Sequence, residues 1–124
     1  MKSLILLSII FVFLLFPINS VFSELEFDTN AKVYSPEHTL QVYGHGLPGE
    51  NLILRLFAPD ESITKFEQIQ TTSDGSFNYQ LLTWPKPSST VPYGTYVVEV
   101  LSTEQNGLSK KVDIKFSSTT ELIS

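Results

Sequence analysis

Apolar and polar residues alternate with a period of two from Glu24 onward, in short runs that turn residues interrupt about every eight to twelve positions. Side chains two residues apart lie on the same face of a β-strand, so each run predicts a strand with a buried face. The spacing of apolar residues that marks an amphipathic helix is absent from this part of the chain. The pattern therefore predicts an all-β domain over 24–116, a β-sandwich of seven short strands.

One predicted strand, 51–58, is apolar on both faces. Leu52, Leu54 and Leu56 share one face, while Ile53 and Phe57 lie on the other. We interpret it as a central strand that is partly covered on both sides. The seven predicted strands are 25–34, 39–44, 51–58, 63–72, a strand that turns Phe77, Tyr79 and Leu81 inward, 95–101, and a last strand that turns Val112, Ile114 and Phe116 inward and Lys111, Asp113 and Lys115 toward water.

The segments between the strands carry turn chemistry. Pro48 and Gly49 suit a type II turn, and Asp74-Gly75 predicts a hairpin with a tight primed turn. In the strand 63–72, Phe66 and Ile69 are out of phase, which predicts a bulge or a break. The segment 83–93 cannot form regular ladder bonds, so we expect a long crossover and a Greek-key order of strands. Its prolines are Pro85, Pro87 and Pro92.

The first 23 residues have the organisation of a secretory signal peptide. Lys2 precedes a largely apolar run over 4–16, and Pro17 ends the run before a stretch that contains small and polar residues. We predict a signal helix that is cleaved between Ser23 and Glu24, and a secreted or cell-surface product. The alternative is an uncleaved single-pass anchor, because 4–22 is nearly long enough to span a bilayer. Residues 117–124 are expected to form a flexible tail.

Composition narrows the range of partners. The formal charge is −5, and the acidic residues are scattered, so we expect no binding to nucleic acid phosphates. The chain has no cysteine, so packing rather than disulfides must stabilise the domain. A basic cluster near the C-terminus is interrupted as in a two-sided strand, and we interpret it as a solvated face.

No residue set encodes an identifiable catalytic chemistry. The candidate bases for a serine nucleophile, His38 and His45, lie in loops, and no G-x-S-x-G turn is present. Two histidines without cysteine are too few for a zinc site. We therefore expect no enzyme activity and no cofactor.

Calcium is an open alternative, because acidic residues occur in several turns and at the start of the domain. Their spacing matches no known calcium loop, and aspartates in turns commonly bond their own backbone, which is the interpretation we favour. The candidate ligands are Glu24, Glu26, Asp28, Asp60, Glu61 and Asp74.

Three aromatic residues are candidates for ligand binding: Trp84, beside Pro85 and Pro87, Tyr93 in the same crossover, and Tyr43 on the outward face of its strand. Exposed aromatics can stack on sugars or anchor a protein partner. Trp84 has a second interpretation, a plug that closes the core beneath the long loop, and we favour it. Open strand edges are a third route, because an edge can add a partner strand.

Several motifs resemble the immunoglobulin-like modules of prokaryotic, especially archaeal, secreted and cell-surface proteins, and more distantly macroglobulin-type domains. They are Tyr34-Ser35-Pro36, the segment Leu-Gln-Val-Tyr-Gly-His-Gly-Leu-Pro-Gly at 40–49, Phe57-Ala58-Pro59-Asp60, Asp74-Gly75-Ser76-Phe77 and Pro92-Tyr93-Gly94-Thr95-Tyr96. The resemblance implies an immunoglobulin-like Greek-key sandwich in which Tyr96 anchors a corner. Glu37 departs from it, since these modules usually have Gly there.

These observations lead to an expectation of function. We expect a non-catalytic extracellular binding module with a structural, adhesive or protein-binding role, whose partners are other envelope or extracellular proteins. The alternative is a carbohydrate-binding or enzyme-accessory domain that uses its exposed aromatics on glycans. Contact with a membrane is expected only through an uncleaved anchor.

Overall fold

The structure is a computed structural model that describes residues 24–118. It is all-β, and within these residues the helical structure is a single 3-10 turn, η2 (Thr103–Gln105). The predicted signal helix, Ser23 of the predicted cleavage site and residues 119–124 lie outside the described residues. The strands are β1 (Glu26–Thr29), β2 (Val33–Tyr34), β3 (Thr39–His45), β4 (Asn51–Phe57), β5 (Ile63–Gln70), β6 (Ser76–Thr83), β7 (Gly94–Ser102) and β8 (Leu108–Phe116).

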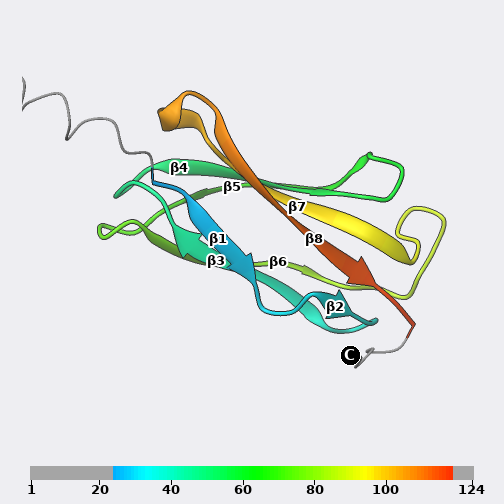
Figure 1. Cartoon of the computed structure of the whole chain (residues 1–124). Helices are drawn as coiled ribbons and strands as arrows, with labels where there is room; N and C mark the ends of the chain where they lie inside the picture. The colour runs from blue at the N-terminus through cyan, green and yellow to red at the C-terminus, as the bar shows by residue number, and fades with distance from the viewer. Residues whose placement is uncertain (1–23, 119–124) are drawn as a thin grey trace, which may run out of the picture.

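The strands form two sheets that pack face to face (Figure 1). The smaller sheet has the order β1-β3-β6, and the larger has the order β2-β8-β7-β4-β5. All neighbours are antiparallel except β2 and β8. The segment between β6 and β7 carries the chain from the smaller sheet to the larger, as predicted for the proline-rich crossover.

The core lies between the sheets and follows the predicted alternation. Leu52, Leu54 and Leu56 of β4 are fully buried, as are Val98 and Val100 of β7. β4 lies between β7 and β5, which confirms the prediction of an interior strand. The remaining core positions come from both sheets and the loops: Leu25, Tyr34, Leu40, Val42, Ala58, Phe77, Leu81, Trp84, Tyr96, Ile114 and Phe116.

The structure has eight strands where seven were predicted, because the segment 25–34 changes sheets. β1 pairs with β3 of the smaller sheet, and β2 pairs with β8 of the larger. The bend between them is held by side chains: the Thr29 hydroxyl donates to the Ala31 carbonyl at 2.8 Å, and the Ala31 amide donates to the Tyr34 hydroxyl at 3.1 Å. A single run of alternating residues therefore serves two sheets.

The predicted irregularity in the fourth segment lies earlier than expected. The β4–β5 ladder is regular from Leu56–Lys65 to Asn51–Gln70, and the register shifts beyond Lys65, where Phe57 pairs with Ile63. The extra residue is Thr64. Phe66 and Ile69 are out of phase for another reason: Ile69 packs against the core, whereas Phe66 is 54% exposed on the outer face.

The turn predictions had mixed outcomes. Gly49 has φ 65 and the Glu50 amide donates to the Leu47 carbonyl at 3.3 Å, as a type II turn requires. Gly75 also has positive φ, 88, but Asp74 does not, so the turn is not the primed type I′ turn. The prediction of a hairpin was wrong, because the turn joins β5 of the larger sheet to β6 of the smaller one.

One end of the sandwich, which we call the polar end, is closed around the buried carboxylate of Glu50. This side chain is 0% exposed. It accepts hydrogen bonds from the backbone amide of Leu47 at 2.5 Å, the Ser102 hydroxyl and the side-chain amide of Gln105 at 3.0 Å. Within residues 24–118, its partners are neutral donors rather than a cation. These bonds tie the β3–β4 loop to the β7–β8 turn.

The opposite end, which we call the aromatic end, is closed by rings. Trp84 follows β6 and is 1% exposed, and its ring stacks on Phe116 at 4.5 Å and meets Tyr96 edge-on at 4.9 Å. Tyr34 completes the cluster at 5.8 Å from Trp84. The Tyr96 hydroxyl donates to the Pro92 carbonyl at 2.6 Å, which is the corner bond that the sequence resemblance implied.

Candidate functional site

The three aromatic candidates do not form a common surface. Trp84 lies in the core, so neither face of its indole is available to a ligand. Tyr93 is 40% exposed and packs against Phe116 at 4.8 Å. Tyr43 is 42% exposed but belongs to β3 of the other sheet, three residues from the loop that enters the polar end. A sugar-stacking platform that uses all three residues is therefore not assembled.

The aspartates among the calcium candidates bond to their own turns. Asp74 accepts bonds from the Thr72 hydroxyl, the Ser76 hydroxyl and the Ser76 amide, and these bonds lower the pKa of Asp74 to about 2. The Ser62 hydroxyl and amide likewise lower the pKa of Asp60. In the part of the chain that the structure describes, no three acidic, histidine or cysteine side chains gather as metal ligands would.

The acidic residues near the start of the domain have basic partners. Lys32 forms an ion pair with Asp28 and lowers its pKa through a side-chain hydrogen bond. The ammonium of Lys110 lies 3.1 Å from a carboxylate oxygen of Glu26. Both pairs are exposed, so each contributes little to stability.

The histidines lie apart. His38 is exposed, and both of its ring nitrogens lie 3.2 Å from the Ser35 hydroxyl. That contact spans one turn, in which the His38 amide donates to the Ser35 carbonyl. Among the described residues, no carboxylate hydrogen-bonds His38 as the third member of a catalytic triad would. His45 lies on β3, the strand that enters the polar end.

A different surface stands out, the outer face of the five-stranded sheet. The cross-strand register places Phe66, Arg55, Glu99 and Lys111 in one row across β5, β4, β7 and β8. The next row on one side contains Ile53 and Leu101, and the next on the other side contains Phe57, Val97 and Asp113. Apolar side chains thus surround a line of charged ones on a face that no other described element covers.

An ion pair is embedded at the centre of this outer face. The Nε atom of Arg55 donates to a Glu99 carboxylate oxygen at 2.6 Å, and the guanidinium lies 5.3 Å from the centroid of the Phe57 ring. Glu99 is only 5% exposed, although its side chain points away from the core. A carboxylate buried on an outer face needs such a partner, because desolvation is costly without one.

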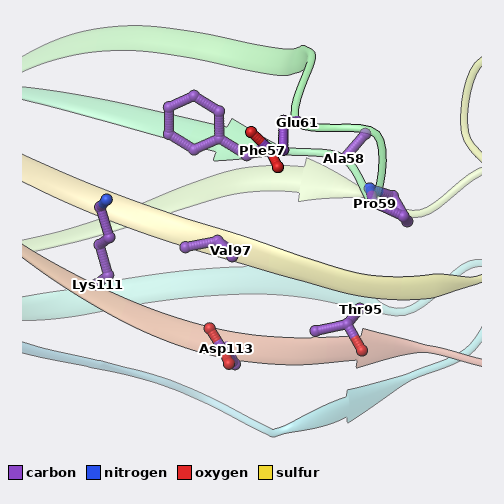
Figure 2. A pocket seen from close by; sticks show the side chains of 8 residues that line it. All are labelled: Phe57, Ala58, Pro59, Glu61, Thr95, Val97, Lys111 and Asp113. Atoms are coloured by element: carbon purple, nitrogen blue, oxygen red, sulfur yellow. The ribbon is translucent and has the colours of Figure 1, made fainter.

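Beside this pair lies a hollow of about 530 Å³ (Figure 2). Figure 2 shows that its walls come from β4, β7, β8 and the turn after β4. Phe57, Val97 and Pro59 supply apolar surface, while Lys111 and Asp113 supply charges of both signs. Pockets that combine apolar surface with polar groups are suited to anchoring a side chain of a partner.

Sequence reasoning did not identify this face as a site. The available signal was the apolar character of both faces of the segment 51–58. The alternation does not predict the cross-strand register. That register brings Phe57 beside Val97, 40 residues later, and Arg55 beside Glu99, 44 residues later. Lys111, Asp113 and Lys115 are exposed, as predicted for the outward residues of the last strand.

Comparisons with known proteins give distant structural similarities only. No model of a known protein family matches the chain, and no curated protein matches its sequence. A carbohydrate acetylesterase from Xanthomonas citri is similar with a TM-score of 0.47 and 14% identity, over 68% of this chain and 16% of that one. The sporulation control protein Spo0M from Bacillus subtilis is similar with a TM-score of 0.38 and 17% identity, over 80% of this chain and 51% of that one.

Its two packed sheets make this chain a β-sandwich. It has distant structural similarity to parts of both proteins, and no family is assigned to it. Within residues 24–118, no helix is long and apolar enough to cross a bilayer.

Proposed function

We propose that this chain is a non-catalytic, exported immunoglobulin-like module that binds another protein at or near the cell surface through the outer face of its five-stranded sheet. The leader-like segment 1–23 supports export. The immunoglobulin-like assignment is supported by the alternation of the chain between two sheets and by the Tyr96 corner bond at the start of β7.

The observation that carries the proposal is the ion pair of Arg55 and Glu99 within an uncovered apolar surface. A solvated sheet face normally carries polar side chains on alternate positions. Here Ile53, Phe57, Val97 and Leu101 occupy those positions and are partly buried among themselves. Interfaces commonly combine apolar anchors with Arg and a polar rim, which is the composition of this face.

Charges at the rim define the chemistry of the partner. Glu61, Lys111 and Asp113 border the hollow, so an aromatic or aliphatic side chain that enters it can be flanked by charged or hydrogen-bonding groups. The hollow of about 530 Å³ has room for an apolar side chain of a partner. We therefore infer a protein partner that inserts an apolar anchor, rather than a glycan.

A photo-crosslinking experiment in the intact envelope tests this proposal. A photoreactive phenylalanine analogue at Val97 should capture a discrete partner, and the adduct should be lost when Lys111→Glu is added. The same analogue at Gln80, an exposed position of β6 on the other sheet, is the matched control. Equal capture from Val97 and Gln80, or glycan-array binding that Lys111→Glu leaves unchanged, would refute a protein-binding role for this face.

A further inference from the structure

β5 is a free edge of the larger sheet and carries an unusual density of exposed apolar surface. The sheet order ends at β5, and the strand runs for eight residues without proline. Four large apolar side chains of the described chain are exposed, and two of them, Ile63 (50%) and Phe66 (54%), belong to β5. Long edges of this kind pair readily with another strand unless a protective feature prevents it.

The charges on this edge form no ion pair within the described residues. The three ion pairs among residues 24–118 involve neither Lys65 nor Glu67. One carboxylate oxygen of Glu67 accepts a bond from the Tyr79 hydroxyl at 3.1 Å, which leaves the other oxygen for a further partner. Lys65 and Glu67 lie on the same side of β5, because they are two positions apart along the strand.

The sequence of β5 is complementary to itself in the antiparallel direction. A two-fold axis perpendicular to the sheet keeps each residue on the same face of the sheet in both copies. Such an axis must therefore pass midway between the two copies of one residue. Centred on Phe66, it places Lys65 of each copy opposite Glu67 of the other and the two Phe66 rings opposite each other.

The neighbouring registers are disfavoured. An axis through Lys65 would set two lysines against each other, and an axis through Glu67 would set two glutamates against each other. Like charges directly opposite on paired strands are destabilising, whereas opposite charges and aromatic pairs are stabilising. The charge pattern therefore selects one register.

We propose that two copies of this chain pair through β5 in that register and form one continuous sheet. The two outer faces, with their Arg55–Glu99 pairs, then lie on the same side of the merged sheet, so the dimer presents two binding faces. The bulge at Thr64 ends the regular edge, so the pairing is short. Short edge contacts bury little area, and the association is therefore weak and dependent on concentration.

Charge exchange tests the register. In sedimentation equilibrium of the exported protein, Lys65→Glu and Glu67→Lys should each weaken the dimer about tenfold, because two attractive pairs become repulsive. An equimolar mixture of the two variants should form a heterodimer, since each glutamate then faces a lysine. Lys86→Glu, in the exposed loop after β6, is the control with the same charge change. Thermal melts verify that each variant is folded.

A cysteine scan tests the axis directly, because the chain has no native cysteine. Phe66→Cys places two thiols opposite each other and should form a disulfide-linked dimer under mild oxidation. Gln68→Cys, on the same face two residues away, should cross-link far more slowly. A wild-type protein that stays monomeric up to its solubility limit, or equal cross-linking at both positions, overturns the proposal. Neither measurement depends on the partner proposed for the outer face.

Discussion

The two ends of the sandwich are closed by opposite chemistry. At the polar end, the buried Glu50 carboxylate collects three neutral donors from two loops. At the aromatic end, Trp84 packs among Tyr34, Tyr96 and Phe116. One end is held by directional hydrogen bonds to a buried carboxyl group, and the other by the burial of apolar area and by ring packing.

The two ends also differ in how completely polar atoms are satisfied. At the polar end the Thr71 hydroxyl accepts from the Glu50 amide at 2.8 Å and donates to the Leu47 carbonyl at 2.6 Å. At the aromatic end the indole N–H of Trp84 is buried without a partner within the described chain. The aromatic end thus retains an unpaired donor, and its packing must offset that cost.

The polar end also leaves less room for a larger side chain. A Cβ atom at Gly46 would lie 2.5 Å from a carboxylate oxygen of Glu50, which is too close for a non-bonded contact. The Gly46 amide donates to the Gly75 carbonyl at 2.7 Å and joins the β3–β4 loop to the β5–β6 turn. The hydrogen bonds that close the polar end therefore require glycine at position 46 and a fixed path of the loop. The aromatic end requires large side chains that fill its interior.

The largest expected effect is at the aromatic end. Trp84→Ala should lower the free energy of unfolding by about 3–5 kcal/mol, because a buried ring in contact with three others is replaced by a cavity. Trp84→Phe should cost much less, since it keeps a ring on Phe116 and removes the unpaired N–H. Chemical denaturation with a shared m-value measures both. If both variants lost the same free energy of unfolding, the packing of the ring could not be what stabilises this end.

A smaller loss is expected at the polar end. Glu50→Leu should cost about 2 kcal/mol, because the Leu47 amide is left buried without an acceptor while Ser102 and Gln105 can reorient. Glu50→Gln, which keeps one carbonyl acceptor, is the matched control and should cost less.

Hydrogen exchange separates the two ends in the same samples. The Leu47 amide should be protected in the wild type and exchange rapidly in Glu50→Leu. The Trp84 amide, which donates to the His38 carbonyl at 2.9 Å, should keep its protection. Rapid exchange of the Leu47 amide in the wild type would show that Glu50 does not hold the loop.

The two ends differ in how far the sequence predicts them. The alternation along the last strand predicted that Ile114 and Phe116 face inward, and both are buried, because local patterns determine which face of a strand is apolar. The prolines that follow Trp84 predicted the crossover beside it. Glu50 follows a Pro-Gly turn, where a charged residue is ordinarily solvated. Its burial depends on Ser102 and Gln105, which are 52 and 55 residues away.

The turn at Asp74-Gly75 illustrates the same limit. Its residues determine a local backbone path, and Gly75 does adopt positive φ. They contain no information on whether the flanking strands pair with each other or with different sheets. The outer-face site was inaccessible to sequence reasoning for a related reason, because it depends on the register of four strands.

The smallest expected effect concerns the turn that adjoins the polar end. Hydrogen bonds from Thr72 and Ser76 lower the pKa of Asp74 from 3.8 to about 2 in the folded protein. The folded state therefore favours the ionised carboxylate. The resulting stability is present above pH 3.8 and is lost as the pH falls through about 2. Asp74→Asn should flatten the dependence of the denaturation midpoint on pH between about 5 and 2.

The pH dependence of stability can also be compared between the two ends, because Asp60 lies in the turn after β4 at the aromatic end. Ser62 alone supplies its two bonds, at 2.6 and 3.0 Å, and lowers its pKa in the same direction. Asp60→Asn should therefore flatten the profile less than Asp74→Asn, because the Asp60 carboxylate receives hydrogen bonds from one residue and the Asp74 carboxylate receives them from two. If Asp60→Asn flattens the pH profile more than Asp74→Asn, the acid sensitivity of the fold resides at the aromatic end. The turn at Asp74 would then contribute less than Glu50 to the stability of the polar end.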